Sequence, residues 1–206
     1  MARGLAVLAA SVACSLIRAP APATPTAALK PSPEPNVVAE FDASDESWAD
    51  LHRAVQETPG DVIREAEELL GSPDLSTRFA AVYALGLTVD ESQAYLLVPA
   101  LSDQNQGLRT IAAGALIGLG EVESIPILIE ALVGDESLPY LEPPTRAWTL
   151  AHAALIHYTG RDFGFLEAVR SDDVVARQTA VAAWQLWWAE AGLDLTWDAA
   201  SQRYVP

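Results

Sequence analysis

The chain repeats one short pattern four times, and this repetition restricts its possible folds more than any other feature of the sequence. In each copy an arginine is followed at fixed offsets by small and apolar residues. The four arginines are separated by 31, 37 and 31 residues and are Arg78, Arg109, Arg146 and Arg177. A shared period of this length is typical of stacked helical units, so the sequence predicts a repeat architecture.

Each unit contains the signals of two helices joined by a turn. Helix A has apolar residues at helical spacing, as in Leu96, Leu97, Ala100 and Leu101 of the second unit. A turn follows, and helix B begins near the arginine. The six extra residues before the third arginine predict a loop insertion between Val133 and Pro143. We also expect a capping helix at 47–58 and a short fourth helix A at 163–169.

The first 23 residues have the layout of a secretory signal. Arg3 precedes an apolar run from Leu5 to Ile17 that is too short to span a bilayer, and small residues follow it. We therefore expect residues 1–23 to direct export. An uncleaved, disordered N-terminus is the alternative. Cys14 follows a small residue, as in a bacterial lipobox, so lipid attachment at Cys14 is a further hypothesis.

The remaining chain divides into three parts. Residues 24–44 are rich in Pro and Ala and have no periodicity that could bury one face, so we expect a disordered tether. Residues 45–192 hold the repeats. Residues 193–206 contain two short β-type runs around Asp198–Ser201, which predict a capping hairpin over the last helix.

The charge of the chain is strongly negative. Asp and Glu number 28 against 12 for Lys and Arg, which gives a net charge of −16. Such a surface repels nucleic acid and anionic lipid, so we expect neither nucleic-acid binding nor membrane insertion of the mature domain. The alternative interpretation is that the charge only keeps the protein soluble. We expect a monomer that binds a protein or peptide.

The sequence contains few signals of catalysis. It has no P-loop, no dinucleotide-binding fingerprint and no G-x-S-x-G motif. Its three histidines lack the spacing of zinc ligands. We therefore predict no catalytic residue, no metal site and no cofactor.

The helix B pattern resembles that of a known repeat family. An alanine-rich helix opens with arginine and continues to Ala84-Leu85-Gly86 in the first unit and Ala115-Leu116-Ile117-Gly118 in the second. This is similar to HEAT-like repeats, including the short form named after phycobilisome lyases, over residues 61–191. Residues 158–164 and 187–198 also look like the closing portion of exported bacterial HEAT-repeat proteins. The resemblance implies an all-α fold, a short right-handed α-solenoid of about four hairpins with one continuous core.

Two groups of residues are candidates for function. The four arginines are interpreted as structural anchors that bond to carboxylates or carbonyls near the A–B turns, such as Asp74 and Asp103. A stripe at offsets one, five and eight from each arginine has no charged residue. It is either a concave groove for a peptide or helix, or core.

His152 occupies an offset that is alanine in the other units, and Trp148 lies beside it. It is either a partner contact or a histidine satisfied inside a wider helix pair. The candidate partner-binding residues are Phe79, Tyr83, Ile117, Trp148, His152, Gln178 and Gln185.

These features together favour a non-catalytic protein-binding module or scaffold in the cell envelope, either periplasmic or extracellular. Two alternatives remain. One is an enzyme or chromophore-processing factor of the phycobilisome-lyase type, and the other is a structural subunit of an envelope assembly, anchored through Cys14.

Overall fold

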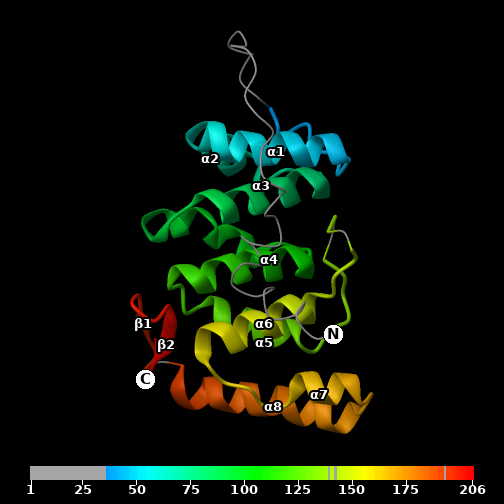
Figure 1. The fold of residues 1–206 in the computed structure, drawn as a ribbon, viewed down its shortest axis with the longest axis vertical. Helices are drawn as coiled ribbons and strands as arrows, with labels where there is room; N and C mark the ends of the chain where they lie inside the picture. Colours follow the sequence, from blue (N-terminus) through cyan, green and yellow to red (C-terminus); the bar gives the residue numbers. More distant parts are fainter. Residues whose placement is uncertain (1–35, 139, 142, 193) are drawn as a thin grey trace, which may run out of the picture.

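The computed structural model describes residues 36–206 apart from 139, 142 and 193. The predicted signal segment, Cys14 and most of the predicted tether therefore lie outside the described residues. Helices follow one another through the described chain and stack along the long axis of the molecule, with α1 and α2 at one end and α7 and α8 at the other (Figure 1). The elements are α1 (Asp45–Glu57), α2 (Pro59–Leu69), α3 (Leu75–Thr88), η1 (Glu91–Leu96), η2 (Val98–Ser102), α4 (Gln106–Leu116), η3 (Ile117–Leu119), α5 (Ser124–Ala131), α6 (Ala147–Thr159), α7 (Phe165–Arg170), α8 (Val174–Ala191), β1 (Thr196–Asp198) and β2 (Arg203–Val205), where η marks a 3₁₀-helix.

Helices α1 and α3 begin at caps that the sequence supplies. The Ser44 side chain accepts a hydrogen bond from Ser47 N at the start of α1, and two carboxylates lie in the first turn of that helix, where the helix dipole favours them. Asp74 caps α3 in the same way by accepting from Thr77 N at 2.9 Å. Helix α1 packs on α2 and α3, so it has the capping position that the sequence predicts.

The second unit differs from the expected α-helical form. Its helix A consists of two 3₁₀ segments, η1 and η2. Backbone bonds there join residues three apart, as from Leu97 N to Ala94 O at 2.9 Å and from Ala100 N to Leu97 O at 3.0 Å. Pro99 has no N–H to donate to an α-helical bond, which favours the tighter winding. Leu97 and Ala100 are still buried, so the regularly spaced apolar residues of this segment face the core.

The loop insertion in the third unit lies where it was predicted, between α5 and α6. Leu138 N donates to Thr145 O at 2.7 Å, and Ala147 N donates to Glu136 O at 2.8 Å. These two hydrogen bonds join the beginning of the loop to its end. Its path brings Tyr140 to the aromatic side chains of α3 in the first unit.

The last unit is shortened. Helix α7 has six residues, and the 18-residue α8 packs against both α7 and α5 of the preceding unit. Trp184 is fully buried between Phe163 and Trp187, with ring centroids 4.8 and 5.5 Å away. The tryptophans of α8 therefore close this end of the core.

The C-terminal hairpin forms, but its position differs from the prediction. β1 and β2 pair antiparallel with Trp197 opposite Tyr204. The hairpin packs on α6 and η3 instead of the last helix, and the Tyr204 hydroxyl donates to Ile117 O at 3.3 Å. Gly120 ends η3 with φ +88°, and the absence of a side chain there leaves room for the Trp197 ring.

The described part of the predicted tether belongs to the folded domain. Val38 is fully buried and Phe41 nearly so. Val38 N and Ala39 N donate to the Glu65 carboxylate of α2 at 3.1 and 3.0 Å. From residue 36 onward the chain is thus packed, because its apolar side chains join the core. One connected apolar core runs from this segment to the hairpin.

Among the described residues, no helix combines the length and the apolar character that crossing a membrane requires.

Candidate partner-binding surface

The arginines of the first two units hold successive A–B turns together. Arg78 Nε donates to Asp103 Oδ2 at 2.8 Å, and its Nη1 donates to the carbonyls of Ser72 and Pro73 at 3.0 and 3.2 Å. Arg109 Nη1 donates to Asp103 O at 2.9 Å, so it binds its own turn in the same way. The expected contact to Asp103 is therefore present. Asp74, by contrast, is used as the cap of α3.

The third and fourth arginines lie in different surroundings. Arg146 Nη1 donates to Asp135 O at 2.6 Å in its own loop. Arg177 Nη2 reaches Gly134 O at 3.2 Å, in the turn of the third unit, and its guanidinium lies 5.7 Å from the Phe165 ring centroid. Arg177 therefore binds carbonyls near an A–B turn, as expected, but the turn belongs to the preceding unit, because α8 packs directly against α5.

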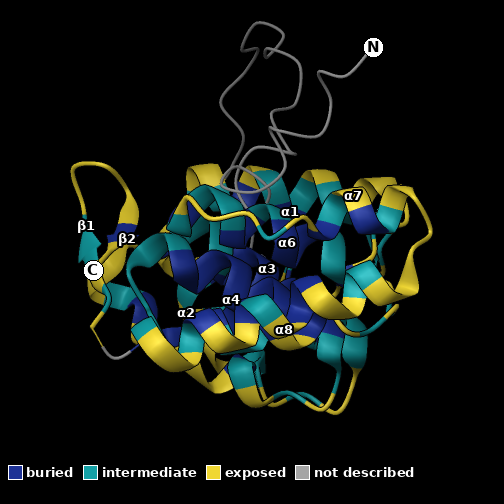
Figure 2. Cartoon of the chain, turned by 90° about the horizontal axis from the view of Figure 1, so that it is seen from below, coloured by how far each residue is buried: buried dark blue, intermediate teal, exposed yellow. Residues whose placement is uncertain are grey.

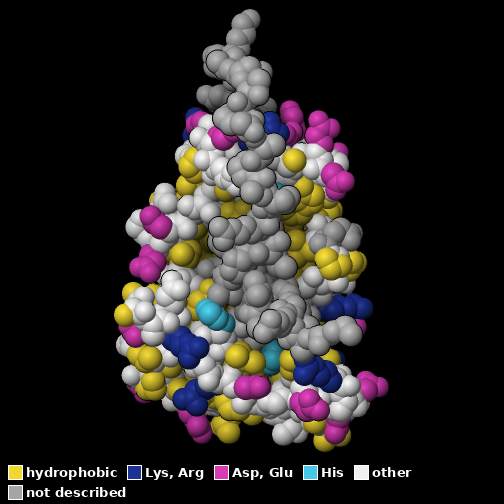
Figure 3. Space-filling model, viewed as in Figure 1, with side chains coloured by type: hydrophobic (Ala, Val, Ile, Leu, Met, Phe, Trp, Pro, Cys, Tyr) yellow, Lys and Arg dark blue, Asp and Glu magenta, His cyan; other side chains and the backbone are white. Residues whose placement is uncertain are grey.

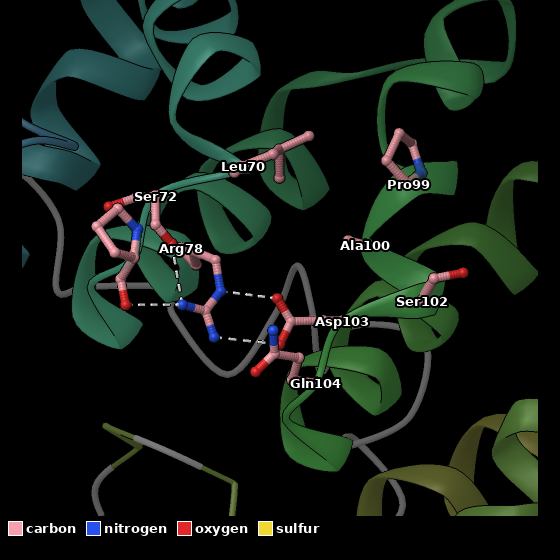
Figure 4. Close-up of a pocket in the computed structure, with 10 residues that line it drawn as sticks. Leu70, Ser72, Arg78, Pro99, Ala100, Ser102, Asp103 and Gln104 are labelled. Carbon is pink, nitrogen blue, oxygen red and sulfur yellow. Dashed lines mark hydrogen bonds and ion pairs between the residues drawn. The ribbon is translucent and has the colours of Figure 1, made fainter.

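A cavity of about 580 Å³ lies between the turns of the first and second units (Figure 4). Arg78 and Asp103 face each other on its wall, and Leu70, Pro99 and Ala100 supply apolar lining. Burial would raise the pKa of Asp103, but hydrogen bonds from Arg78 and Asn105 N lower it below its ordinary value. The pKa of Arg78 is raised by the same pair.

Because these charges are already matched, the cavity offers little to a charged ligand. Both carboxylate oxygens of Asp103 accept from Arg78, at 2.8 and 3.3 Å, and the remaining Nη1 is shared between two carbonyls. The arrangement clamps two units together. We interpret it as structural.

A second group of side chains forms a cluster of aromatic rings. The aromatic cluster comprises Phe41, Trp48, His52, Phe79, Tyr83 and Tyr140. The Trp48 centroid lies 5.0 Å from Phe41, 5.0 Å from Tyr83 and 5.7 Å from Phe79, edge to face in each case. Tyr140 joins from the inserted loop, 5.2 Å from Phe79. Such pairs add to the stabilisation that comes from burial alone.

The aromatic cluster has a buried floor and partly exposed walls. Phe79 and Tyr83 are buried on α3, whereas Trp48, His52 and Tyr140 are only half-buried. His52 stacks on Trp48 with centroids 5.6 Å apart, and its Nε2 lies 3.4 Å from the Tyr83 hydroxyl. Burial lowers the pKa of His52, so this wall is uncharged at neutral pH.

Acidic side chains surround this end of the molecule. Figure 3 shows Asp and Glu over the end formed by α1 and α2. Residues 36–58 carry six carboxylates and one arginine, and that arginine, Arg53, pairs with Asp50. The aromatic cluster is thus an uncharged patch with an acidic border.

His152 is buried on α6 and lies against the α6–α7 connection and the start of α7. Its ring centroid is 5.3 Å from that of Phe165, and its Nε2 is 3.9 Å from Asp162 Oδ1. That separation suits an ion pair but is too long for a hydrogen bond, and Nε2 has no hydrogen-bond partner among the described residues. Burial lowers the pKa of His152, although Asp162 opposes the shift.

The predicted partner-binding residues divide by exposure. Phe79, Tyr83, Ile117 and His152 are buried, which makes them part of the core. Trp148 is half-buried, with its ring 5.9 Å from that of Phe165. Gln178 and Gln185 are exposed on α8. The stripe is therefore core in the first three units and surface in the fourth.

Sequence reasoning missed four of the six members of the aromatic cluster, which are Phe41, Trp48, His52 and Tyr140. Trp48 and His52 are four residues apart, a spacing that places them on one helix face and could have signalled the patch. Tyr140 gave no such signal, because only the path of the inserted loop brings it to α3. Within the described chain, no group of three or more His, Cys, Asp or Glu side chains is placed to hold a metal ion.

Comparison with known proteins supports the repeat assignment for part of the chain. Residues 63–140 match a family model described as HEAT repeats. The matched segment runs from α2 into the loop after α5, and so covers the first two units and the start of the third. Comparison with curated proteins gives no match, and comparison with solved structures gives none either.

Proposed function

We propose that this HEAT-like solenoid is an exported, non-catalytic protein-binding module of the cell envelope, and that the aromatic cluster is its main contact surface. The match of residues 63–140 to HEAT repeats supports the general role, because solenoids of this kind present extended surfaces to partners. The observation that carries the proposal is that half-buried rings from two segments pack around the buried Phe79. Trp48 of α1 and Tyr140 of the inserted loop lie 5.7 and 5.2 Å from Phe79, and His52 stacks on Trp48.

The composition of the patch fits a protein contact. Aromatic residues are enriched at the energetically important centres of interfaces, where a ring fills a pocket and neighbouring groups exclude water. Here Phe79 and Tyr83 fix the positions of the outer rings from beneath. The rings therefore need no large rearrangement to bind, which lowers the entropic cost of association.

The acidic border favours a partner with a positively charged surface. A partner with lysine or arginine side chains beside apolar ones gains attraction from the surrounding carboxylates and a cation–π contact with the rings. An acidic partner is repelled by the net charge of −16.

The envelope location rests on the N-terminal sequence, with its positive start and apolar run. Labelling cells with a fatty-acid analogue tests attachment at Cys14. We expect label on the native chain only if the lipid-anchored form is made, and none on a Cys14→Ser variant.

Affinity capture from the native envelope tests the binding proposal. Trp48→Ala and Tyr140→Ala each remove one half-buried ring of the cluster, whereas Tyr95→Ala removes an exposed ring on η1 that is not a member of the cluster. We expect the first two variants to lose the partner that the native chain and Tyr95→Ala both retain. Equal recovery of that partner by all four proteins would refute the role of the aromatic cluster.

A further inference from the structure

His52 lies in the partly exposed wall of the aromatic cluster, where its charge acts on the neighbouring rings and on any partner bound to them. It belongs to α1, which has exposed and half-buried residues, whereas α3 beneath it is buried from Phe79 to Leu85 (Figure 2). The His52 ring stacks on Trp48 with an interplanar angle of 20° and meets Tyr83 edge to face at 6.0 Å. Among the members of the cluster, only His52 has a side chain that ordinarily changes its charge between about pH 5 and 8.

The contact between His52 and Tyr83 depends on the protonation state of the imidazole. Nε2 lies 3.4 Å from the Tyr83 hydroxyl oxygen. In a neutral imidazole one ring nitrogen donates and the other accepts, so a hydrogen bond of either direction suits this pair. In the imidazolium both nitrogens donate, and the Tyr83 oxygen has to accept. Protonation therefore fixes this hydrogen bond in one direction and places a positive charge against the rings.

The charged groups around α1 do not compensate a positive charge on His52. Helix α1 packs on α2 and α3, and several charged groups of the three helices bind other groups. These are Asp50 with Arg53, Asp61 with Arg64, Glu65 with the N–H groups of Val38 and Ala39, and Arg78 with Asp103. The remaining charged side chains on α1, on α2 and in the segment before α1 are Glu40, Asp42, Asp45, Glu46, Glu57, Glu67 and Glu68.

None of these groups acts measurably on the imidazole within the described chain. Burial lowers the pKa of His52, and a backbone hydrogen bond at Trp48 opposes this shift only in part. No carboxylate lies close enough to raise this pKa. The neutral form is therefore the one that the packed cluster favours, and the charged form has no partner of opposite charge within the fold.

We propose that His52 is a pH-sensitive switch of the aromatic cluster: the neutral imidazole permits a basic partner to bind, and the imidazolium weakens its binding. The inference rests on the proposed function of the cluster as a contact surface. A lysine or arginine of the partner binds within about 6 Å of a ring centroid. An imidazolium stacked on Trp48 repels that cation and already makes a cation–π contact with the same ring.

The size of the effect follows from the repulsion between two like charges. Unit charges about 6 Å apart in partly hydrated surroundings weaken binding roughly three- to tenfold. By linkage, a bound cation lowers the pKa of His52 by the same interaction. The carboxylates of the border ordinarily titrate near pH 4, so they keep their charge over most of the range in which His52 changes. Glu65, whose pKa is raised by burial, is the exception on α2.

A defined basic peptide tests the switch. The probe is a short synthetic peptide of alternating arginine and leucine with blocked ends, whose charge is constant between about pH 5 and 8. Isothermal titration calorimetry with the full chain measures its affinity at both ends of this range. We expect roughly three- to tenfold weaker binding at the lower pH. His157→Gln, which removes a histidine of α6 outside the cluster, should retain this dependence, whereas His52→Gln should bind equally at both pH values.

A second variant and a second readout examine the charge itself. His52→Lys is positively charged at both pH values and should bind the peptide as weakly as the native chain does at the lower pH. Far-UV circular dichroism shows whether each variant is folded. Because the chain has three histidines, comparison with His52→Gln assigns the imidazole resonance of His52 in an NMR titration. The pKa obtained from that resonance should decrease when the peptide is present at saturation.

Two results would overturn the switch. One is equal affinity of the native chain at both pH values, and the other is an undiminished pH dependence in His52→Gln. Trp48→Ala separates this inference from the proposed function. If Trp48→Ala binds the peptide as tightly as the native chain, the contact surface is refuted and the switch with it. If Trp48→Ala loses the peptide while native binding does not change with pH, only the switch is refuted.

Discussion

Removal of the Arg78 side chain should show how strongly the units depend on the clamp at their turns. Arg78 and Asp103 are 15 and 9% exposed, and four hydrogen bonds from the guanidinium join the turns of two units. In Arg78→Ala, the buried carboxylate of Asp103 keeps only the hydrogen bond from Asn105 N. The carbonyls of Ser72 and Pro73 lose the hydrogen bonds that Arg78 donates to them. Loss of one partner from a buried ion pair costs about 3–5 kcal/mol.

The partial exposure of this pair reduces the expected loss to about 2–4 kcal/mol, since water can reach the abandoned groups. For a domain of this size, that loss lowers the melting temperature by roughly 5–15 °C. Thermal and urea unfolding followed by circular dichroism measure it. Arg53→Ala removes an arginine of an exposed pair and should cost less than about 1 kcal/mol.

A double-mutant cycle with Asp103→Asn separates the pair from the other contacts of Arg78. We expect a coupling energy of about 1–3 kcal/mol. The pKa of Asp103 is lowered in the folded state, so its stabilisation is complete at neutral pH and is lost as the pH falls below the ordinary value of 3.8 and through the folded pKa. If Arg78→Ala and Arg53→Ala have equal stabilities, the clamp does not hold the units together and the reasoning is wrong.

Two further predictions concern other parts of the molecule. Gly120→Ala should destabilise the protein by about 1–3 kcal/mol and weaken the near-UV circular dichroism signal of Trp197. The new methyl group would contact the Trp197 ring, and residue 120 has a left-handed backbone conformation that alanine disfavours. Gly71→Ala is the control, because its methyl group meets no neighbour within 4 Å and the substitution should be nearly neutral. The free energy of unfolding should decrease as the pH falls below 6.5 and level off below the folded pKa values, because burial lowers the pKa of His52, His152 and His157. Unfolding titrations of His152→Ala should show a weaker pH dependence. If the His152 side chain only fills the core, the same variant should capture the partner as well as the native chain does.

The local features of the fold could be read from the sequence because they depend on neighbours along the chain. The arginine period predicted the repeated helix B, and apolar spacing identified the buried face of each helix A. Polar residues at the helix starts, such as Asp74 and Asn105, became caps through hydrogen bonds to residues three positions away. The extra residues before Arg146 were correctly assigned to a loop.

Features that depend on contacts between distant segments required the tertiary structure. The same offset is buried in α3 and exposed in α8, because Phe41 and Trp48 before α3 and Tyr140 of the inserted loop pack on Phe79, whereas Gln178 of α8 stays exposed. Arg177 binds the turn of the third unit because the six-residue α7 lets α8 pack against α5. The hairpin lies on α6 and η3 because Gly120 leaves space for Trp197 there.

The candidate site shows the same division. Trp48 and His52 share a helix face for reasons visible in their spacing, but Tyr140 reaches Phe79 only because the inserted loop extends back across the stack. Sequence by itself determined the repeating unit and its acidic surface, since these follow from local hydrogen bonding, apolar periodicity and composition. The tertiary structure decided which apolar faces are covered and which remain open, since coverage depends on the packing of segments far apart in the chain.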